Sequence, residues 1–171
     1  MSSTEPTFGE LLGPCRRSAV HLEMRDVYYG TEKLVEWQRG QRVDWADRDS
    51  WWGPFYQDVA DAVARGVTVR RARIVSEPVT DYIRYEHYWT YANVAAGEQV
   101  RWLPRRHTTD LCLPGNDFWV FDADRIRIHH FSGDGDIIER EITDDGIAIE
   151  HCAAAFEAVW ARAIPHEEYK V

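Results

Sequence analysis

The chain has 171 residues, of which 44% are hydrophobic and 13% aromatic, and a formal net charge of −9. This length and apolar content are typical of one globular domain with a sizeable core. The acidic balance argues against nucleic acid and anionic membranes as general partners. No apolar run approaches the roughly 18 residues of a membrane span, and the first residues lack the basic-then-apolar pattern of a secretion signal. We therefore expect a cytoplasmic protein with one domain over residues 1–171, in which residues 1–6 are flexible.

The cysteines and the short motifs indicate neither a metal site nor a cofactor. Cys15, Cys112 and Cys152 are far apart and show no C-x-x-C spacing, which predicts reduced thiols. His129 and His130 are adjacent in a predicted strand, so their side chains point to opposite faces and make a poor metal pair. No G-x-S-x-G, Walker or G-x-G-x-x-G motif occurs. We therefore expect no cofactor.

The first part of the chain predicts a helix, a strand and a second helix. Thr7 can cap a short helix that is stopped at Gly13-Pro14. Residues Ser18–Arg25 alternate apolar and polar side chains, which predicts a half-buried strand. Thr31 can cap a short helix that runs to Trp37 and is followed by a polar loop.

The middle of the chain predicts two successive helix–strand units. The first helix shows apolar residues at helical spacing and ends before Gly66, a residue suited to a helix stop. The second helix is strongly aromatic and ends before Gly97. The predicted elements are a helix from Ser50 or Pro54 to Gly66, a strand over Val67–Val75, a helix over Thr80–Ala96 and a strand over Glu98–Leu103.

The last part predicts a hairpin, a further strand and a long helix. Asp122-Ala123-Asp124 between two apolar runs is a hairpin signal, whereas Leu111–Leu113 predicts at most a brief pairing inside a loop. The order of all elements predicts an α/β fold with a mixed, partly parallel sheet, flanking helices, a late β-hairpin and a C-terminal helix. The last elements are strands over Asp117–Asp122, Arg125–Phe131 and near Ile137–Ile142, then a helix from Thr143–Asp145 to about Ile164.

The charge is unevenly distributed along the chain. Residues 64–107 carry eight basic and four acidic side chains, while the segments on either side are acidic. Open α/β sheets bind ligands just beyond the ends of their strands, and the arginine fork suits phosphate or carboxylate. We therefore expect a pocket for a small anionic ligand there, the alternative being a solvated basic surface paired with Glu86 and Glu98. The candidate pocket residues are Arg84, Arg101, Arg105 and Arg106.

The aromatic helix supplies a second set of candidates. Tyr85 and Trp89, one helical turn apart, are candidates for gripping a planar ligand. Asp81, Glu86 and His87 on the same helix are candidates for acid–base catalysis. The alternative is an amphipathic helix whose aromatic stripe belongs to the core.

Charged residues of the first strand and the hairpin are further candidates. Glu23 lies on the strand face opposite the apolar residues, so burial of both faces would require a partner for it, and Arg71 or Arg73 is expected to provide one. A structural ion pair is favoured over a catalytic role for Glu23. Asp117 begins the hairpin strand, where turn chemistry explains it as well as a ligand-binding role does.

Five short motifs are Leu22-Glu23 with Asp26-x-Tyr28, Ala64-Arg65-Gly66-Val67-x-Val69-x-Arg71, Pro78-x-x-Asp81-Tyr82, Gly97-Glu98-x-x-Arg101-Trp102-Leu103 and Asn116-Asp117-Phe118-Trp119-x-Phe121-Asp122. Together they resemble an uncharacterised domain family of actinobacteria, and the resemblance covers most of the chain. Members of that family are often encoded beside small helix-turn-helix regulators. The resemblance therefore implies such a regulator as a partner, and it implies no established activity.

The stretch from about Trp51 to Phe131 is similar in layout to the phospholipase D superfamily. In that superfamily too, a helix leads into an Arg-Gly-Val-x-Val-Arg strand, a second helix–strand unit follows, and a His-x-Lys strand enters a hairpin. In this chain, alignment on the strand Phe118–Asp122 places Gly115 at the position of the nucleophilic His and Asp117 at that of the Lys. The resemblance implies a phospholipase D-like fold without that catalytic machinery.

These observations favour a non-catalytic regulatory or interaction protein, which binds a small anionic ligand or a partner such as a helix-turn-helix regulator. The second hypothesis is an enzyme that acts on a phosphorylated or carboxylated small molecule, and direct binding of nucleic acid ranks last because of the net charge. The acid–base candidates of the enzyme are Glu23, Asp81, Glu86 and His87. An apolar surface for a protein partner is expected at four tryptophans that are predicted to be exposed, namely Trp37, Trp45, Trp51 and Trp52.

Overall fold

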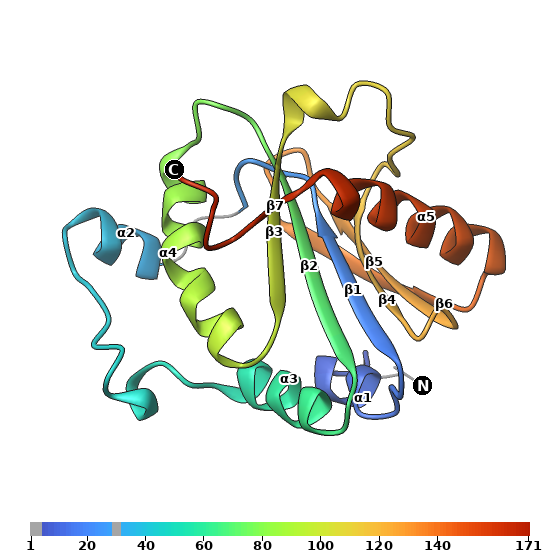
Figure 1. The fold of residues 1–171 in the computed structure, drawn as a ribbon, viewed down its shortest axis with the longest axis horizontal. Helices are drawn as coiled ribbons and strands as arrows, with labels where there is room; N and C mark the ends of the chain where they lie inside the picture. Colours follow the sequence, from blue (N-terminus) through green and yellow to red (C-terminus); the bar gives the residue numbers. More distant parts are fainter. Residues whose placement is uncertain (1–4, 29–31) are drawn as a thin grey trace.

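The computed structural model describes residues 5–28 and 32–171, and one seven-stranded sheet forms its centre (Figure 1). The strands are β1 Ser18–Glu23, β2 Thr68–Val75, β3 Gln99–Pro104, β4 Asp117–Phe121, β5 Arg125–Phe131, β6 Ile137–Thr143 and β7 Ile164–Pro165. They lie in the order β6-β5-β4-β1-β2-β3-β7. The pairs β1–β2 and β2–β3 are parallel and the other pairs are antiparallel, which confirms the predicted mixed sheet.

The helices begin where the sequence predicts capping residues. The Thr7 hydroxyl accepts from the Glu10 backbone and the Glu10 carboxylate accepts in return, which is a complete capping box. The side chains of Thr80 and Asp145 cap two longer helices by accepting a backbone hydrogen bond from Ile83 and Ile147, respectively, while the predicted cap Thr31 lies outside the described residues. The helices are α1 Phe8–Leu12, α2 Glu32–Gln38, α3 Pro54–Ala64, α4 Asp81–Ala95 and α5 Gly146–Arg162, with short 3-10 turns at Arg48–Ser50 and Arg105–His107.

Two glycines join a helix directly to the next strand. Gly66 follows α3 and Gly97 follows α4, with φ of +91° and +96°. A residue with a Cβ rarely adopts this left-handed conformation, so glycine ends the helix and turns the chain into the strand. A Cβ at Gly97 would also approach a methyl group of Val63 to 3.0 Å. Both predicted helix–strand units are confirmed.

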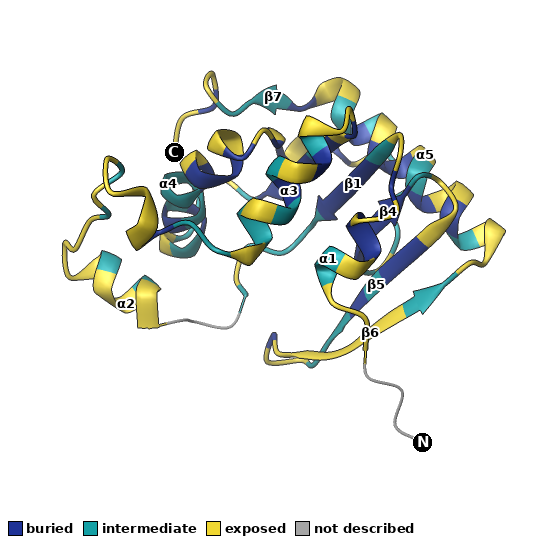
Figure 2. Ribbon diagram, turned by 90° about the horizontal axis from the view of Figure 1, so that it is seen from below, coloured by how far each residue is buried: buried dark blue, intermediate teal, exposed yellow. Residues whose placement is uncertain are grey.

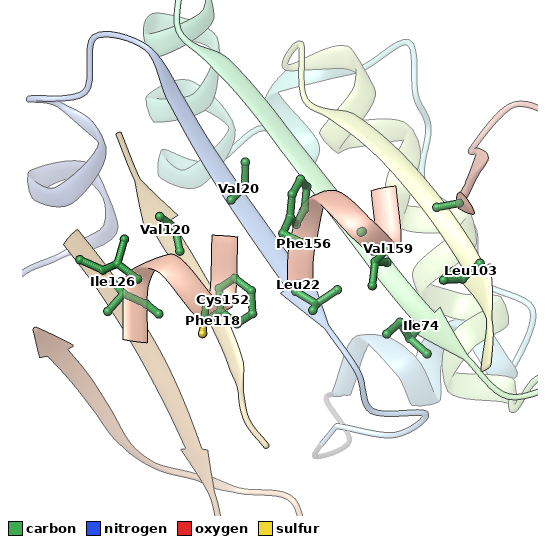
Figure 3. Close-up of a cluster of buried hydrophobic side chains, with 13 residues drawn as sticks. Val20, Leu22, Ile74, Leu103, Phe118, Val120, Ile126, Cys152, Phe156 and Val159 are labelled. Atoms are coloured by element: carbon green, nitrogen blue, oxygen red, sulfur yellow. The ribbon is translucent and has the colours of Figure 1, made fainter. Parts of the chain in front are cut away.

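One face of the sheet is apolar and is covered by α5. Alternating strand residues such as Leu22, Ile74 and Phe118 point to this face and are completely buried. Cys152 and Phe156, one turn apart on α5, pack against them (Figure 3). The predicted C-terminal helix is therefore the element that closes this core.

The opposite face is covered by α1, α3 and α4 and is part apolar, part charged. Beside α1 and α3, Val69, Trp119 and Phe121 form an apolar cluster. The central strand β1 is buried between the layers, whereas β6 and α2 are largely exposed (Figure 2). The charged part is formed by polar residues that alternate with the α5 core along β1 and β2, namely His21, Glu23, Arg71 and Arg73.

The hairpin turn between β4 and β5 fastens the start of β1. Asp122 and Ala123 have φ of +53° and +59°, and the Asp122 carboxylate accepts hydrogen bonds from the backbone N–H groups of Arg16, Arg17 and Ser18 at 2.8, 2.8 and 2.9 Å. Burial opposes ionisation of Asp122, but these backbone hydrogen bonds hold its pKa below the usual value.

Replacing Asp122 by alanine is expected to lower the free energy of unfolding by about 1–2 kcal/mol, since three backbone donors lose their acceptor. Urea denaturation measures the change. Asp124→Ala is the matched control, because Asp124 lies in the same turn but is exposed and has an exposed ion-pair partner, Arg17. Equal effects of the two substitutions would contradict a special role for Asp122.

Two details of the strands differ from what the sequence predicts. The two-residue strand β7, which pairs antiparallel with β3, was not predicted. Leu111–Leu113 forms no strand. Within residues 5–28 and 32–171, no helix is long and apolar enough to cross a membrane.

The four tryptophans expected at an exposed surface are not exposed. Trp51 is only 8% exposed, and Trp37, Trp45 and Trp52 are half-buried. The polar residues around them suggested a solvated loop, but the rings pack against one another and against the aromatic side chains of α4. Trp45 lies 5.6 Å from Trp89 and 5.4 Å from Trp51, measured between ring centroids. The prediction of an apolar docking surface made by these residues is therefore wrong.

Candidate functional site

A pocket of about 430 Å³ lies on the charged face of the sheet, between the strands and the helices that cover them. This volume lies within the range of about 300–1,000 Å³ that is typical of small-molecule sites. Six of the lining residues are Phe, Tyr or Trp, and we call it the aromatic pocket. Its lining residues are His21, Lys33, Trp51, Phe55, Tyr56, Arg71, Arg73, Tyr85, Glu86, Trp89, Asn93 and Trp119.

Helical spacing explains the wall that α4 contributes. Tyr85, Glu86, Trp89 and Asn93 recur at intervals that place them on one face of a helix. The predicted amphipathic helix thus exists, but its aromatic stripe is shared between the core and the pocket, because Tyr85 is buried and Trp89 is half-buried. The Lys33 ammonium lies 5.1 Å from the centre of the Trp89 ring, which is a cation–π distance.

The floor of the pocket is held by a buried ion network, which we define as Glu23, Arg71, Arg73, Glu86 and Glu98. Arg71 Nη1 donates to Glu23 Oε1 at 2.8 Å, and Arg73 Nε donates to Glu23 Oε2 at 2.5 Å. The predicted partnership of Glu23 with Arg71 or Arg73 is confirmed, and both arginines take part. A single carboxylate therefore bridges two buried guanidinium groups.

The helix α4 and the start of β3 complete this ion network. Arg71 Nε donates to Glu98 Oε1 at 2.7 Å, and Asn93 donates to the other oxygen of Glu98 at the same distance. Arg73 Nη1 donates to the hydroxyl of Thr90 at 2.5 Å. Because every charged group has a partner of opposite charge, the network can exist away from water.

Glu86 differs from Glu23 in its ionisation. Burial raises its pKa to about 7, and the nearby positive charge of Arg73 offsets only part of this effect. By contrast, burial opposes ionisation of Glu23, but Arg73 and Arg71 together hold its pKa well below the usual value. Glu86 Oε2 is 3.6 Å from Arg73 Nε and has no hydrogen-bond partner among the described residues. Glu86 is thus a buried carboxyl group at the pocket that titrates near neutral pH.

His21 and Trp119 form the side of the pocket toward β4. Their rings stack with centroids 4.4 Å apart and planes 5° from parallel. The Nδ1 atom of His21 donates to the carbonyl oxygen of Phe118 at 2.7 Å, and its Nε2 atom lies 3.1 Å from Glu23. Burial lowers the pKa of His21, which favours the neutral ring.

The structure brings together three of the candidates on the aromatic helix and leaves two outside the aromatic pocket. Tyr85, Glu86 and Trp89 line it. Asp81 is exposed and accepts from Arg84 at 3.0 Å. His87 Nε2 lies 3.0 Å from the carbonyl oxygen of Tyr169, in the last turn of the chain. Of the acid–base candidates, Glu86 therefore lines the pocket and Glu23 supports its floor.

The four candidate arginines do not converge on one site. Arg84 is on α4, whereas Arg101 reaches the opposite face of the sheet, where it lies 4.4 Å from the centre of the Trp160 ring of α5. Arg105 donates to Ser76 and to the backbone carbonyls of Met24 and Ile74. Arg106 is exposed. These arginines were expected to meet at the ends of the strands. Their side chains instead point in different directions and contact different parts of the protein.

Arg105 does lie beside another candidate, Asp117. Both line a hollow of about 500 Å³ next to the start of β4, together with Arg25. Asp117 is buried and accepts from the Tyr28 hydroxyl and from the backbone N–H of Met24. Burial raises the pKa of Asp117 to about 6. The hydrogen bonds of Asp117 serve to hold the end of β1, as turn chemistry would.

Most of the pocket was missed by reasoning from the sequence. Lys33, Trp51, Phe55 and Trp119 come from four separate elements, and no local pattern connects them. The one available signal was the charged side of β1 and β2, because charges on a strand buried on both faces must meet partners that cover it. Within residues 5–28 and 32–171, no three His, Cys, Asp or Glu side chains are placed to hold a metal ion.

The fold is similar to solved structures at low sequence identity. A phospholipase D family member, Nuc from Salmonella typhimurium, superimposes with a TM-score of 0.50 and 10% identity, over 95% of this chain and 88% of that one. TrmBL2, an archaeal chromatin protein, gives a TM-score of 0.45 and 12% identity, over 91% of this chain and 47% of that one. The similarity to Nuc shows the fold alone, because the sequence identity is low, and it supports the phospholipase D-like layout.

Sequence comparison gives the family and no function. No curated protein matches the chain. Residues 6–171 match the family described as "Domain of unknown function (DUF6879)", and with nearly its whole length matched, the chain belongs to that family.

Proposed function

We propose that this protein is a non-catalytic regulatory protein whose aromatic pocket binds a small ligand with a planar group and an anionic group. The observation that carries the proposal is the composition of the pocket, in which six aromatic side chains meet Lys33, Arg71 and Arg73. Aromatic walls favour a flat apolar body. Glu23 and Glu98 balance the two arginines, so Lys33 supplies the cation that remains for an anionic group of the ligand.

A phosphodiesterase of the phospholipase D type needs a nucleophilic His and a Lys, and this chain has other residues at the two corresponding positions. Gly115 and Asp117 stand where the resemblance expects the nucleophilic His and the Lys. Asp117 is engaged by Tyr28 and Met24. The non-catalytic half of the proposal rests on these two positions.

The regulatory half of the proposal rests on the resemblance to a family encoded beside helix-turn-helix regulators. Lys33 and Trp51 belong to the stretch 32–53, which spans α2 and the following loop and forms one wall of the pocket. None of the residues of α2 is buried. A ligand that contacts Lys33 and Trp51 would therefore act on an outward-facing segment, where a partner protein can sense it.

Replacing Trp89 by alanine is expected to weaken binding of 1-naphthyl phosphate about tenfold, which is about 1.4 kcal/mol, because one aromatic wall and the cation–π contact of Lys33 are removed. Isothermal titration calorimetry measures the affinity. Lys33→Met is expected to weaken the same probe and to leave binding of uncharged naphthalene methanol unchanged.

The matched control for Trp89 is Tyr91→Ala. Tyr91 is an aromatic residue of the same helix, is 48% exposed and does not line the aromatic pocket. Equal affinity of the wild type and the Trp89 variant for 1-naphthyl phosphate, or no binding to the wild type, would sink the proposal.

One observation favours a second function, catalysis. Glu86 lines the pocket, its Oε2 atom has no hydrogen-bond partner among the described residues, and burial raises its pKa to about 7, a value suited to a general acid or base. Incubation with a panel of phosphorylated and carboxylated small molecules, followed by NMR, would detect turnover. Turnover by the wild type and its loss in Glu86→Gln would replace the non-catalytic proposal by this one.

A further inference from the structure

We infer that the anionic group of the ligand is a carboxylate that binds to Arg71 and Arg73 on the floor of the aromatic pocket, so that the ligand is an aromatic carboxylic acid. This inference deepens the proposed function and rests on it. Its evidence is a spare N–H group on each arginine, the charge balance of the pocket and the contact of Arg71 with two aromatic walls.

Each of the two arginines keeps one terminal nitrogen outside the ion network. The Nε and Nη1 atoms of Arg71 donate to Glu98 and Glu23. Those of Arg73 donate to Glu23 and Thr90. The Nη2 atom of each arginine has no hydrogen-bond partner among residues 5–28 and 32–171, and both Nη2 atoms are accessible to solvent. The network therefore fixes two guanidinium groups and leaves an accessible donor on each.

The accessible part of these two side chains faces the pocket. Arg71 and Arg73 are only 8% and 5% exposed, and both line the pocket, whereas the carboxylate of Glu23 that they share does not. Arg71 Nη1 and Arg73 Nε hold the two oxygens of Glu23 at 2.8 and 2.5 Å, so the two guanidinium groups are fixed side by side. Two neighbouring N–H donors in one pocket suit the two oxygens of a carboxylate.

The charge balance of the pocket favours a carboxylate over a phosphate. The two arginines of the floor are balanced by the carboxylates of Glu23 and Glu98, so Lys33 is the cation that remains. The pocket thus has at most one positive charge in excess, and ionisation of Glu86 would cancel it. A carboxylate brings one negative charge, whereas a phosphate monoester carries about −1.5 to −2 near pH 7. The second charge of a phosphate would have no partner in this partly buried site.

Aromatic walls adjoin these donors. The guanidinium carbon of Arg71 lies 5.6 Å from the centre of the Phe55 ring and 5.5 Å from that of Trp119, and all three residues line the pocket. Stacking on His21 fixes the Trp119 ring. A ligand whose carboxylate pairs with Arg71 would therefore place its neighbouring atoms against these rings, which favour a flat apolar group. These contacts favour an acid whose carboxylate is attached close to an aromatic ring.

The test compares 1-naphthoate, 1-naphthyl phosphate and naphthalene methanol on the wild type by isothermal titration calorimetry at neutral pH. The three probes share one ring system and differ in the polar group. 1-Naphthoate is expected to bind about tenfold more tightly than either of the others, because only its polar group matches both the donors and the charge of the pocket.

Arg71→Lys keeps a positive charge beside its two carboxylate partners but has no spare guanidinium N–H. It is expected to weaken 1-naphthoate about tenfold and to change the affinity for naphthalene methanol little. Arg70→Lys is the matched control and is expected to bind 1-naphthoate as the wild type does, because the Arg70 guanidinium pairs with Glu157 of α5 and does not line the pocket. Thermal unfolding shows whether each variant folds, and Arg73→Lys replaces Arg71→Lys if the latter does not.

The possible failures are distinguishable. If 1-naphthyl phosphate binds as tightly as 1-naphthoate, or if a folded lysine variant binds 1-naphthoate as the wild type does, the carboxylate at the two arginines is wrong and the proposed anionic, planar ligand stands. If neither 1-naphthoate nor 1-naphthyl phosphate binds to the folded wild type, the proposed function and this inference are both overturned.

Discussion

Replacing Glu23 by glutamine is expected to lower the free energy of unfolding by about 3–5 kcal/mol, the cost of removing one partner from a buried ion pair. The carboxylate bridges Arg71 and Arg73, whose side chains are only 9% and 6% exposed. The neutral amide keeps the shape but leaves two guanidinium groups with less negative charge than they need. Urea denaturation at neutral pH measures the loss.

The loss of stability in Glu23→Gln is expected to be limited by the other carboxylates of the ion network, which still pair with the two arginines. Arg71 keeps Glu98, and Arg73 keeps Glu86 at 3.6 Å. The negative charge of Glu23 helps to raise the pKa of Glu86, so in the Glu23→Gln variant Glu86 is expected to ionise more readily and to stabilise Arg73. The double variant Glu23→Gln/Glu86→Gln lacks this response and is expected to be less stable than the sum of the single effects predicts.

Glu157→Gln is the matched control for Glu23→Gln. Glu157 also forms a close ion pair, with Arg70 at 2.5 Å, but its side chain is 57% exposed. Ion pairs in water contribute about 0–1 kcal/mol, so this variant is expected to be nearly as stable as the wild type. A Glu23→Gln variant that matches Glu157→Gln would show that the buried network contributes little to stability.

The elements of the fold were predictable from the sequence because their signals are local. Thr7 and Thr80 are capping residues, Gly66 and Gly97 adopt positive φ, and each decides an element boundary through its own backbone. The two residues of β7 carry no such signal. They pair with β3 because α5 ends beside it, which is a consequence of tertiary packing.

The ion-pair partners of Glu23 were predictable for a different reason. The lining of the aromatic pocket was not predictable. A charge on a strand buried on both faces must be paired, and this argument led from Glu23 to Arg71 and Arg73 without knowledge of the fold. The pocket depends on which side chains from distant segments meet. Trp51 illustrates the difficulty, because its polar neighbours in the sequence suggested exposure, whereas Tyr91 of α4 and the tryptophans Trp45 and Trp52 pack against it.

Replacing Glu86 by glutamine is expected to remove a pH-dependent loss of stability. The pKa of Glu86 is about 7 in the folded protein and 4.5 as the ordinary value. Between these two values the folded state keeps a proton that the unfolded state has released, so the free energy of unfolding falls as the pH rises. The shift corresponds to an effect on the order of 3 kcal/mol, complete above about pH 7.

The variant and the wild type are therefore expected to have similar stability near pH 4.5 and to diverge as the pH rises to 7, with Glu86→Gln the more stable. Comparing the two proteins isolates the contribution of Glu86 to the pH dependence of stability. Glu23, whose pKa is lowered, and Asp117, whose pKa is raised, are present in both proteins. Asp81→Asn, on the exposed side of the same helix, is the control and is expected to follow the wild type. Parallel curves for Glu86→Gln and the wild type would mean that this carboxyl group is already ionised in the folded protein at little cost, and the acid–base role would lose its physical basis.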